Sequence, residues 1–399
     1  MKKKILVIGP GMEIGGVERA LLGLLNSIDY ERYEVDLFLF AHTGELMPLI
    51  NPQANLLPEQ KCFSLVNYPI VSLFKKGHFL IGFIRLFSKI IGDFRAKRTK
   101  TESLNITICK KTVSKIAKPL KAHYDIALGF FGPHYYLENK VDADFKIGWA
   151  HTDYSNANEK PDTGFTLPMW AGLDYIACVS EQAKASFDSV YPTLKEKTFV
   201  IENIISAEFV RAQAEAFDVS EEMPAFEGSN ILSVGRFCTA KNFDNIPAVC
   251  KQLKEQGISL RWYLIGYGQD EALIKEKIAE AGTEDTVIIL GKKTNPYPYI
   301  KACDIYAQPS RYEAKAVTVT EAQILGKPVM ITRYKTASSQ VEEGVDGYIC
   351  EQNNEGIAEG IKAVIENKQL REQLIVNTAK RDYSGTVGIQ KIWELAEKQ

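Results

Sequence analysis

The sequence has few cysteines and no long apolar run. Its seven cysteines among 399 residues contain no C-x-x-C pair, which disfavours a disulfide framework and a zinc site. No stretch of 18 uncharged apolar residues occurs, so no segment is predicted to span a bilayer. The short apolar run at residues 5–8 ends at Gly9 and is too short for a signal peptide. We therefore expect a cytoplasmic protein with free thiols.

Two common nucleotide-binding patterns are also missing. Residues 9–16 follow an apolar run and open an expected helix, but a dinucleotide fingerprint needs glycine where Ile14 stands. No Walker A pattern occurs. An NAD site is therefore disfavoured. Gly15 and Gly16 still offer bare amides and room for a ligand beside the backbone, with a tight turn as the structural alternative.

The remaining composition is that of a folded protein, with 45% hydrophobic residues. Alternating strand and helix patterns occur twice, on either side of the polar, acidic segment 206–229, and predict parallel sheets covered by helices. We expect an α/β protein with two doubly wound domains, residues 1–205 and 230–375, facing a central cleft. Segment 206–229 is the expected linker. Residues 376–399 are expected to form a helical segment that packs back toward the first domain.

One block of the chain is strongly basic. Residues 61–123 hold 14 Lys and Arg and two acids, in a chain of net charge −2. Within residues 78–92 only Arg85 and Lys89 interrupt a series of large apolar side chains. A cationic amphipathic helix of this kind suits an anionic membrane surface, and a core-facing helix with a solvated basic side is the alternative. Nucleic-acid binding is not expected, because no nucleic-acid motif accompanies the block.

Two glutamates flank an expected helix start in the second half. Glu313 follows the strand-like run 305–308 and a Pro-Ser turn, and Glu321 lies in an apolar stretch that ends at Gly326. Backbone amides at a helix start favour a bound phosphate, and neighbouring carboxylates can accept hydrogen bonds from sugar hydroxyls. Two exposed helix glutamates are the structural alternative.

Permanent cations follow other expected strands. Arg236 comes at the end of the strand 230–234, and Lys241 follows five residues later, a pair suited to a diphosphate. Lys292 lies in a loop at another strand end. His151 follows the strand 146–150 and should point into the expected cleft, although a lone histidine is more often structural.

Together these segments resemble a GT-B glycosyltransferase of the large retaining family 4, which includes bacterial polysaccharide and lipopolysaccharide enzymes. The resemblance covers nearly the whole chain. Its motifs are Gly15-Gly16-Val17-Glu18-Arg19, Val234-Gly235-Arg236 with Lys241, Leu264-Ile265-Gly266-Tyr267-Gly268, and Glu313 to Glu321 followed by Gly326-Lys327-Pro328-Val329.

The resemblance implies a role for each matching residue. Arg236 and Lys241 would hold the diphosphate of a nucleotide sugar, Glu321 the ribose hydroxyls, and Glu313 hydroxyls of the donor sugar. His151 would lie beside the sugar and the acceptor. The rest of the implied donor-binding set is Gly15, Gly16, Lys292, Lys315 and the amides of Ala316, Val317 and Thr318. Lys315-Ala316 stands where relatives often have Phe-Gly, which leaves the donor sugar undecided.

These implications give the expected function. A sugar would pass from a nucleoside-diphosphate sugar, most simply a UDP-sugar, to a lipid-linked glycan acceptor, with retention and without a metal or other cofactor. The enzyme would act peripherally on the inner face of the cell membrane. The alternatives are a glycosidase using Glu313 and Glu321, a GT-B sugar-nucleotide epimerase, and a non-catalytic membrane-docked carbohydrate-binding subunit.

Overall fold

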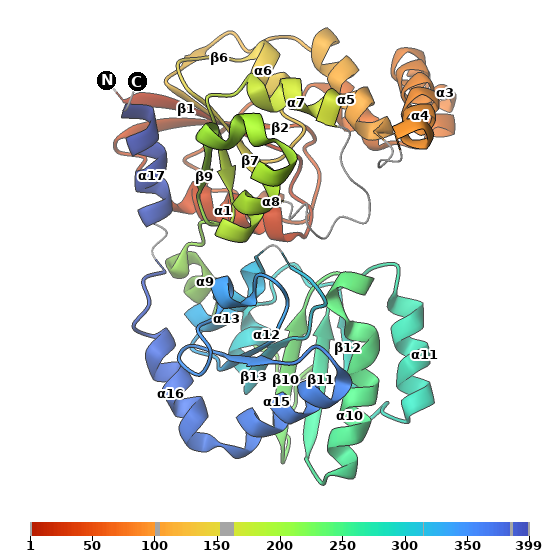
Figure 1. The fold of residues 1–399 in the computed structure, drawn as a ribbon, viewed down its shortest axis with the longest axis vertical. Coiled ribbons are helices and arrows are strands. Elements are labelled where there is room, and N and C mark those ends of the chain that lie inside the picture. Colours follow the sequence, from red (N-terminus) through yellow and green to blue (C-terminus); the bar gives the residue numbers. More distant parts are fainter. Residues whose placement is uncertain (1, 100–103, 152–162, 314, 384–385, 398–399) are drawn as a thin grey trace. The chain divides into compact units, whose positions relative to one another are not determined.

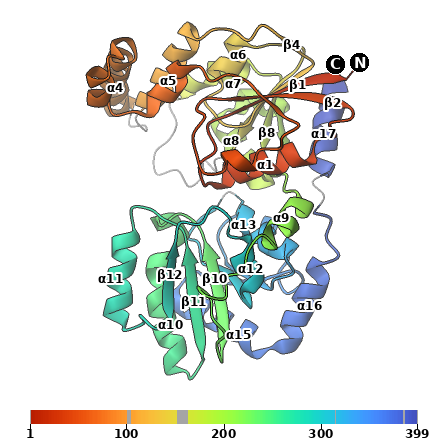
Figure 2. The same ribbon diagram turned by 180° about the vertical axis from the view of Figure 1, so that it is seen from behind.

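The computed structural model describes residues 2–99, 104–151, 163–313, 315–383 and 386–397. The chain divides into two compact units. The first unit comprises Met1–Ile204 together with Thr386–Gln399, and the second comprises Ile205–Gly385. Each unit has its own parallel sheet (Figures 1 and 2). The predicted α/β class with two doubly wound sheets is therefore confirmed.

The first unit contains a seven-stranded sheet. In spatial order its strands are β3 (Asn55–Leu56), β2 (Tyr33–Leu39), β1 (Lys3–Gly9), β5 (Ile126–Gly129), β7 (Lys146–Ala150), β8 (Tyr175–Cys178) and β9 (Thr198–Val200). The short strands β4 (His123–Tyr124) and β6 (Asp142–Ala143) pair separately. Strand β1 is central, with Ile5 opposite both Val35 and Ile126. Its uninterrupted apolar run suits a parallel strand buried on both faces.

Helices cover both faces of this sheet (Figure 1). The helices of the first unit are α1 (Gly16–Ser27), α2 (Lys61–Ser64), α3 (Ile70–Lys75), α4 (Phe79–Thr99), α5 (Asn105–Ile116), α6 (Tyr135–Lys140), α7 (Thr163–Ala171), α8 (Glu181–Val190) and α17 (Thr386–Glu397), of which α3 and α4 lie away from the sheet, next to α5. Three 3₁₀ turns accompany them: η1 (Met47–Leu49), η2 (Leu65–Asn67) and η3 (Pro192–Lys197). Ser180 caps α8, its Oγ accepting from the Ala183 N–H at 3.1 Å. Among the described helices, none has the length and apolar character needed to cross a membrane.

Helix α17 comes from the end of the chain and packs on the first unit. The Trp393 ring stacks on Tyr33 with 4.4 Å between centroids. The Lys391 ammonium donates to the Val200 carbonyl at 2.7 Å. The second unit is therefore inserted, in chain order, between two segments of the first.

The second unit contains a six-stranded sheet. Its strands are, in spatial order, β12 (Val287–Gly291), β11 (Leu260–Ile265), β10 (Ser229–Val234), β13 (Ile305–Gln308), β14 (Val329–Thr332) and β15 (Tyr348–Cys350). Its helices are α9 (Ala207–Ala214), α10 (Ile246–Glu255), α11 (Glu271–Ala281), α12 (Tyr297–Ala302), α13 (Val317–Ile324), α14 (Ala337–Gln340), α15 (Asn354–Glu366) and α16 (Lys368–Thr378), with 3₁₀ turns η4 (Thr239–Lys241) and η5 (Phe243–Asn245).

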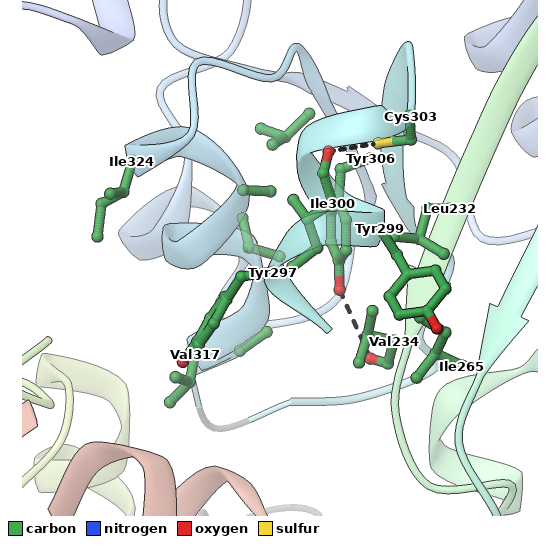
Figure 3. Packing of buried hydrophobic residues seen from close by; sticks show 14 of the residues in the cluster. Leu232, Val234, Ile265, Tyr297, Tyr299, Ile300, Cys303, Tyr306, Val317 and Ile324 are labelled. Atoms are coloured by element: carbon green, nitrogen blue, oxygen red, sulfur yellow. Dashed lines mark hydrogen bonds between the residues drawn. The ribbon is translucent and has the colours of Figure 1, made fainter. Parts of the chain in front are cut away.

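A hydrophobic core lies on each face of the second sheet. Leu232 of β10 packs with side chains of α12 and α13, a cluster drawn in Figure 3. Its neighbour Ile231 belongs to the opposite cluster, which includes side chains of α10, α11 and α15. Adjacent residues of a strand face opposite sides of a sheet, so one apolar run supplies both cores.

The expected linker, residues 206–229, is instead part of the second unit. It begins with α9, and Val210, Ala214, Val219 and Met223 lie in the same core cluster as Leu232. The segment was expected to be a linker because its exposed positions are acidic, although these apolar residues face the core. The second unit also continues to residue 385, ten residues beyond the expected boundary at 375.

Strand order identifies one special position in each sheet. Numbered along its own unit, the second sheet runs 3-2-1-4-5-6, and its order reverses between β10 and β13. In the seven-stranded sheet the reversal lies between β1 and β5. In open α/β sheets, ligands bind beyond the carboxyl ends of the strands at this switch point.

Candidate functional site

The loops at the switch point of the second sheet carry three of the predicted donor-site residues, Arg236, Lys241 and Glu313. Strands β10 and β13 are neighbours, with Leu232 opposite Tyr306. The loop after β10 carries Arg236 and Lys241, and the loop after β13 carries Glu313. Lys241 and Glu313 are 72 positions apart in the sequence, yet the Lys241 ammonium donates to Oε1 of Glu313. Their side chains are only 19% and 11% exposed.

A chain of hydrogen bonds holds the Glu313 carboxylate. Ser310 Oγ donates to Glu313 Oε1 at 2.7 Å and accepts from Gln308 Nε2 at 2.9 Å. The Tyr306 hydroxyl donates to Gln308 Oε1 at 2.8 Å. Both Gln308 and Ser310 are fully buried. Within the described part of the chain, Glu313 Oε2 has no hydrogen-bond partner, so the carboxylate is oriented through one oxygen and can accept a ligand hydroxyl with the other.

Arg236 is exposed, and no partner for its guanidinium is found among the described residues. Its loop is held by backbone bonds from Gly235 N–H to Ile265 and from Phe237 N–H to Tyr267. A Cβ on Gly266 would lie 1.9 Å from the Gly235 carbonyl oxygen, and one on Gly268 would lie 2.2 Å from that of Phe237. These two glycines, noted in the sequence only as part of a motif, let the Arg236 loop pack against its neighbour.

Arg311 is a connecting residue that the sequence analysis missed. Its guanidinium forms two bonds to Asp244, of 2.9 and 2.8 Å, and a third to the Thr239 carbonyl at 2.7 Å. Its N–H donates to the Ala240 carbonyl at 2.8 Å. These bonds join the loop that carries Glu313 to the loop that carries Lys241. Only the adjacency of β10 and β13 could have revealed this pair.

Glu321 lies on the buried face of α13. It is 1% exposed, and its Oε1 accepts from the Tyr297 hydroxyl at 2.7 Å. The alternative of two exposed helix glutamates is therefore wrong for Glu321.

The predicted phosphate-binding amides differ in availability. The Ala316 N–H donates to Gln340 Oε1 at 2.7 Å, and the Gln340 amide donates back to the Ala316 carbonyl at 3.0 Å. Ala316 therefore already has a partner, contrary to the role expected of its amide. Val317 and Thr318 begin α13, where helical N–H groups have no acceptor within the helix.

Two further predicted donor-site lysines have partners elsewhere in the second unit. The half-buried Lys315 donates to the Ser339 carbonyl at 3.4 Å. The exposed Lys292 lies with its ammonium 4.5 Å from the centroid of the Tyr267 ring. Neither contact joins the Lys241–Glu313 pair.

Three predicted site residues of the first unit, Gly15, Gly16 and His151, follow strands of the first sheet. Gly15 precedes α1 in extended backbone, and Gly16 begins the helix. His151 follows β7, and its Nε2–H donates to the Phe130 carbonyl, just past β5, at 2.8 Å. Burial lowers the pKa of His151 to about 4, so the ring is neutral at pH 7. Because Nε2 carries the proton, Nδ1 is the ring's hydrogen-bond acceptor.

One carboxylate pair in the first unit escaped the sequence analysis. Asp142 and Asp144 have D-x-D spacing, and both bind the His123 ring, at 3.2 and 3.1 Å. These bonds raise the pKa of His123. In the described ranges, no group of three or more His, Cys, Asp or Glu is arranged to hold a metal ion.

The comparison with known families concerns the second unit. The family model described as "Glycosyl transferases group 1" matches residues 221–381, which contain Arg236, Lys241, Glu313 and Glu321. Residues 221–381 are thus similar to the group 1 glycosyl transferases. The segment that carries the charged switch point is thus the segment that carries the family likeness.

Curated relatives show the same likeness. An uncharacterized glycosyltransferase of Haemophilus influenzae is 28% identical over 250 residues, which cover 62% of this chain and 67% of that protein. The amylovoran biosynthesis glycosyltransferase AmsK of Erwinia amylovora is 29% identical over 161 residues, or 38% of this chain and 39% of that one. A Campylobacter jejuni N-acetylgalactosamine-N,N'-diacetylbacillosaminyl-diphospho-undecaprenol 4-alpha-N-acetylgalactosaminyltransferase is 27% identical over 37% of this chain and 40% of that one. The chain thus spans about two fifths of the last two relatives.

Solved structures extend the likeness to the whole chain at the level of fold. HepE of Anabaena, in complex with UDP and glucose, matches with a TM-score of 0.70 and 17% identity over 100% of both chains. TarM matches with a TM-score of 0.67 and 13% identity over 99% of both. The fold is therefore GT-B, as expected.

Proposed function

We propose that the chain is a retaining glycosyltransferase that transfers a sugar from a UDP-sugar to a lipid-linked glycan in cell-surface polysaccharide biosynthesis. The observation that carries the proposal is the Lys241–Glu313 pair at the switch point of the second sheet, with Arg236 exposed on the same loop as Lys241. The UDP held by HepE supports the choice of donor. The names of AmsK and of the Campylobacter jejuni relative support the acceptor.

In this proposal the second unit holds the donor by charge and hydrogen bonds. Arg236 and Lys241 neutralise the diphosphate, with the Val317 and Thr318 amides beside it, and no metal or cofactor takes part. Glu313 Oε2 accepts a hydroxyl of the donor sugar. Glu321 accepts ribose hydroxyls, and it can keep the Tyr297 bond because each carboxylate oxygen has two lone pairs.

The transfer itself needs positioning and charge stabilisation more than a strong base. The bond between C1 and the diphosphate oxygen breaks as the two cations stabilise the negative charge that develops on that oxygen. The acceptor hydroxyl attacks C1 from the same face and gives its proton to the departing phosphate oxygen, which retains the anomeric configuration. His151 is neutral at pH 7 and contributes as a hydrogen-bond acceptor through Nδ1, not as a proton donor.

The first experiment is a screen of nucleotide sugars for thermal stabilisation, followed by kinetics of Arg236→Ala. A UDP-sugar should raise the melting temperature of the parent protein, because a ligand bound only to the folded state stabilises it. Arg236→Ala should lower kcat/KM by about 100-fold or more. Lys254→Ala is the control, since this cation lies on α10 in an exposed pair with Asp285.

Two outcomes would count against the proposal. Turnover of Arg236→Ala within tenfold of the parent would remove the diphosphate role of Arg236. Conversion of the nucleotide sugar without consumption of an acceptor would indicate an epimerase in place of a transferase.

A further inference from the structure

Helix α4 exposes most of its large apolar side chains, with Ile81 as a buried exception. Eight large apolar side chains on it are 37–66% exposed. They are Phe79, Leu80, Phe83, Leu86, Phe87, Ile90, Ile91 and Phe94. Gly82, Ser88 and Gly92 are buried instead. A surface helix of a soluble domain normally has the reverse arrangement, with the apolar stripe toward the core.

Close packing fixes this orientation. Helix α4 lies beside α5 in both views of the first unit (Figures 1 and 2) and beside α3 in Figure 1. A Cβ on Gly92 would lie 2.6 Å from the Asn105 backbone nitrogen at the start of α5, and one on Gly82 would lie 3.0 Å from the Phe74 ring of α3. Only the glycine side of α4 allows this approach. The helix therefore cannot turn its apolar side inward without losing these contacts.

The charges around the exposed face are almost all positive. Exposed basic residues lie at the end of α3 and along α4: Lys75, Lys76, Lys89, Lys97 and Arg98. Within the described residues from 61 to 123, Asp93 is the one acidic side chain. A second copy of the chain docked on this face would bring like charges together, whereas anionic lipid headgroups would neutralise them.

We propose that α4 lies flat in the headgroup layer of an anionic membrane. The eight apolar side chains enter the boundary of the acyl chains, and the five cations contact lipid phosphates. The helix has 21 residues, but its other side is packed on α3 and α5, so it lies along the membrane and does not cross it. The inference does not rest on the proposed transfer reaction, because lipid binding can be measured without donor or acceptor.

Vesicle co-sedimentation tests the proposal directly. The parent protein should bind vesicles of phosphatidylglycerol and phosphatidylethanolamine at least tenfold more tightly than vesicles of phosphatidylcholine, and high salt should weaken the binding. The double variant Phe83→Ser/Phe87→Ser should bind the anionic vesicles at least tenfold more weakly, with an unchanged melting temperature. Val376→Ser is the matched control, because Val376 is 54% exposed on α16 of the second unit.

A charge variant gives a second measure. The variant Lys75→Gln/Lys76→Gln/Lys89→Gln should lose most of the preference for anionic over zwitterionic vesicles. Its eight exposed apolar side chains on α4 are unchanged, so only the electrostatic part of the binding is removed. Equal vesicle binding by Phe83→Ser/Phe87→Ser and the parent, or no binding of the parent to anionic vesicles, would overturn the proposal. A dimer in sedimentation that the Phe83→Ser/Phe87→Ser change dissolves, without vesicle binding by the parent, would assign the face to a second copy and also overturn it.

Discussion

The two units have sheets of related strand order but different chemistry at their switch points. In the second unit, Lys241 and Glu313 form an ion pair beside the exposed Arg236. In the first, Gly15 lies in the loop after β1, and the neutral ring of His151, which follows β7, donates to the Phe130 carbonyl just past β5. The difference teaches that the sheet fixes where a ligand can bind, while the loop residues decide whether it is bound by charge or by neutral hydrogen bonds.

The largest expected effect separates stability from function in the second unit. Lys241→Ala leaves the mostly buried Glu313 carboxylate without its cation, and should destabilise this unit by about 3 kcal/mol. The double variant Lys241→Met/Glu313→Gln should recover most of that stability, because no unpaired charge remains, but not the activity. Urea unfolding and kcat/KM measure the two effects. If the double variant lost as much free energy of unfolding as the two single substitutions, Lys241→Met and Glu313→Gln, lose together, Lys241 and Glu313 would not be coupled.

Acid should weaken the first unit through His134. This ring is buried, donates from Nε2 to the Trp149 carbonyl at 3.1 Å, and has its pKa lowered by burial to about 4. The unfolded chain therefore binds more protons between pH 6.5 and 4. The neutral ring contributes its full stability above about pH 6.5 and loses it as the pH falls toward 4, about 2 kcal/mol of it by pH 5.

The free energy of unfolding of His134→Asn, measured at several pH values, tests this contribution. Between pH 7 and pH 5 the free energy of unfolding of the variant should fall less than that of the parent. His123→Gln is the contrasting control. Hydrogen bonds to Asp142 and Asp144 raise the pKa of His123, so its contribution is lost as the pH rises. Equal acid dependence in His134→Asn and the parent would contradict the assignment.

A smaller effect is expected at the connection between the two charged loops. Lysine cannot reproduce the two parallel hydrogen bonds from the Arg311 guanidinium to the Asp244 carboxylate. Arg311→Lys should therefore lower the free energy of unfolding by about 1 kcal/mol. It should raise the donor KM by several-fold and lower kcat by less. The exposed Lys254–Asp285 pair is the comparison, and Lys254→Ala should change neither parameter. If the two variants behave alike, Arg311 does not position the loops.

The smallest structural effect is expected at Gly15. Its φ of −160° is open to any residue, and an added Cβ would meet only the movable end of Glu18. Gly15→Ala should therefore change the free energy of unfolding by less than about 0.5 kcal/mol, yet raise the donor KM. Gly268→Ala should lose more stability, because its Cβ would meet the Phe237 carbonyl. Unchanged kinetics of Gly15→Ala would contradict the role that the family resemblance implies for Gly15.

Inner strands of the second sheet were predictable from the sequence, and three-residue edge strands were not. The strand 305–308 has the predicted bounds, and 230–234 differs by one residue, because both are apolar runs buried on two sides. The strands β9 and β15 have three residues each and were missed. So few residues show no periodicity, and only their place in the sheet defines them.

The site was predictable residue by residue but not as an arrangement. Motif spacing picked out Lys241 and Glu313, and their contact depends on β10 and β13 being neighbours. The burial of Glu321 depends on the Tyr297 hydroxyl from α12, which no local pattern shows. Likewise, the apolar block of α4 was visible in the sequence, but which side faces outward is set by Gly82 and Gly92.

The return of α17 to the first unit affects the order in which the protein can fold on the ribosome. The second unit is one continuous segment and can complete its core as soon as residue 385 has left the exit tunnel. The first unit, although begun earlier, keeps Tyr33 without its Trp393 partner until residues 386–397 have been made. The half of the molecule that starts first should therefore finish last, and a variant truncated after residue 385 should be more easily cut by protease in the first unit than in the second.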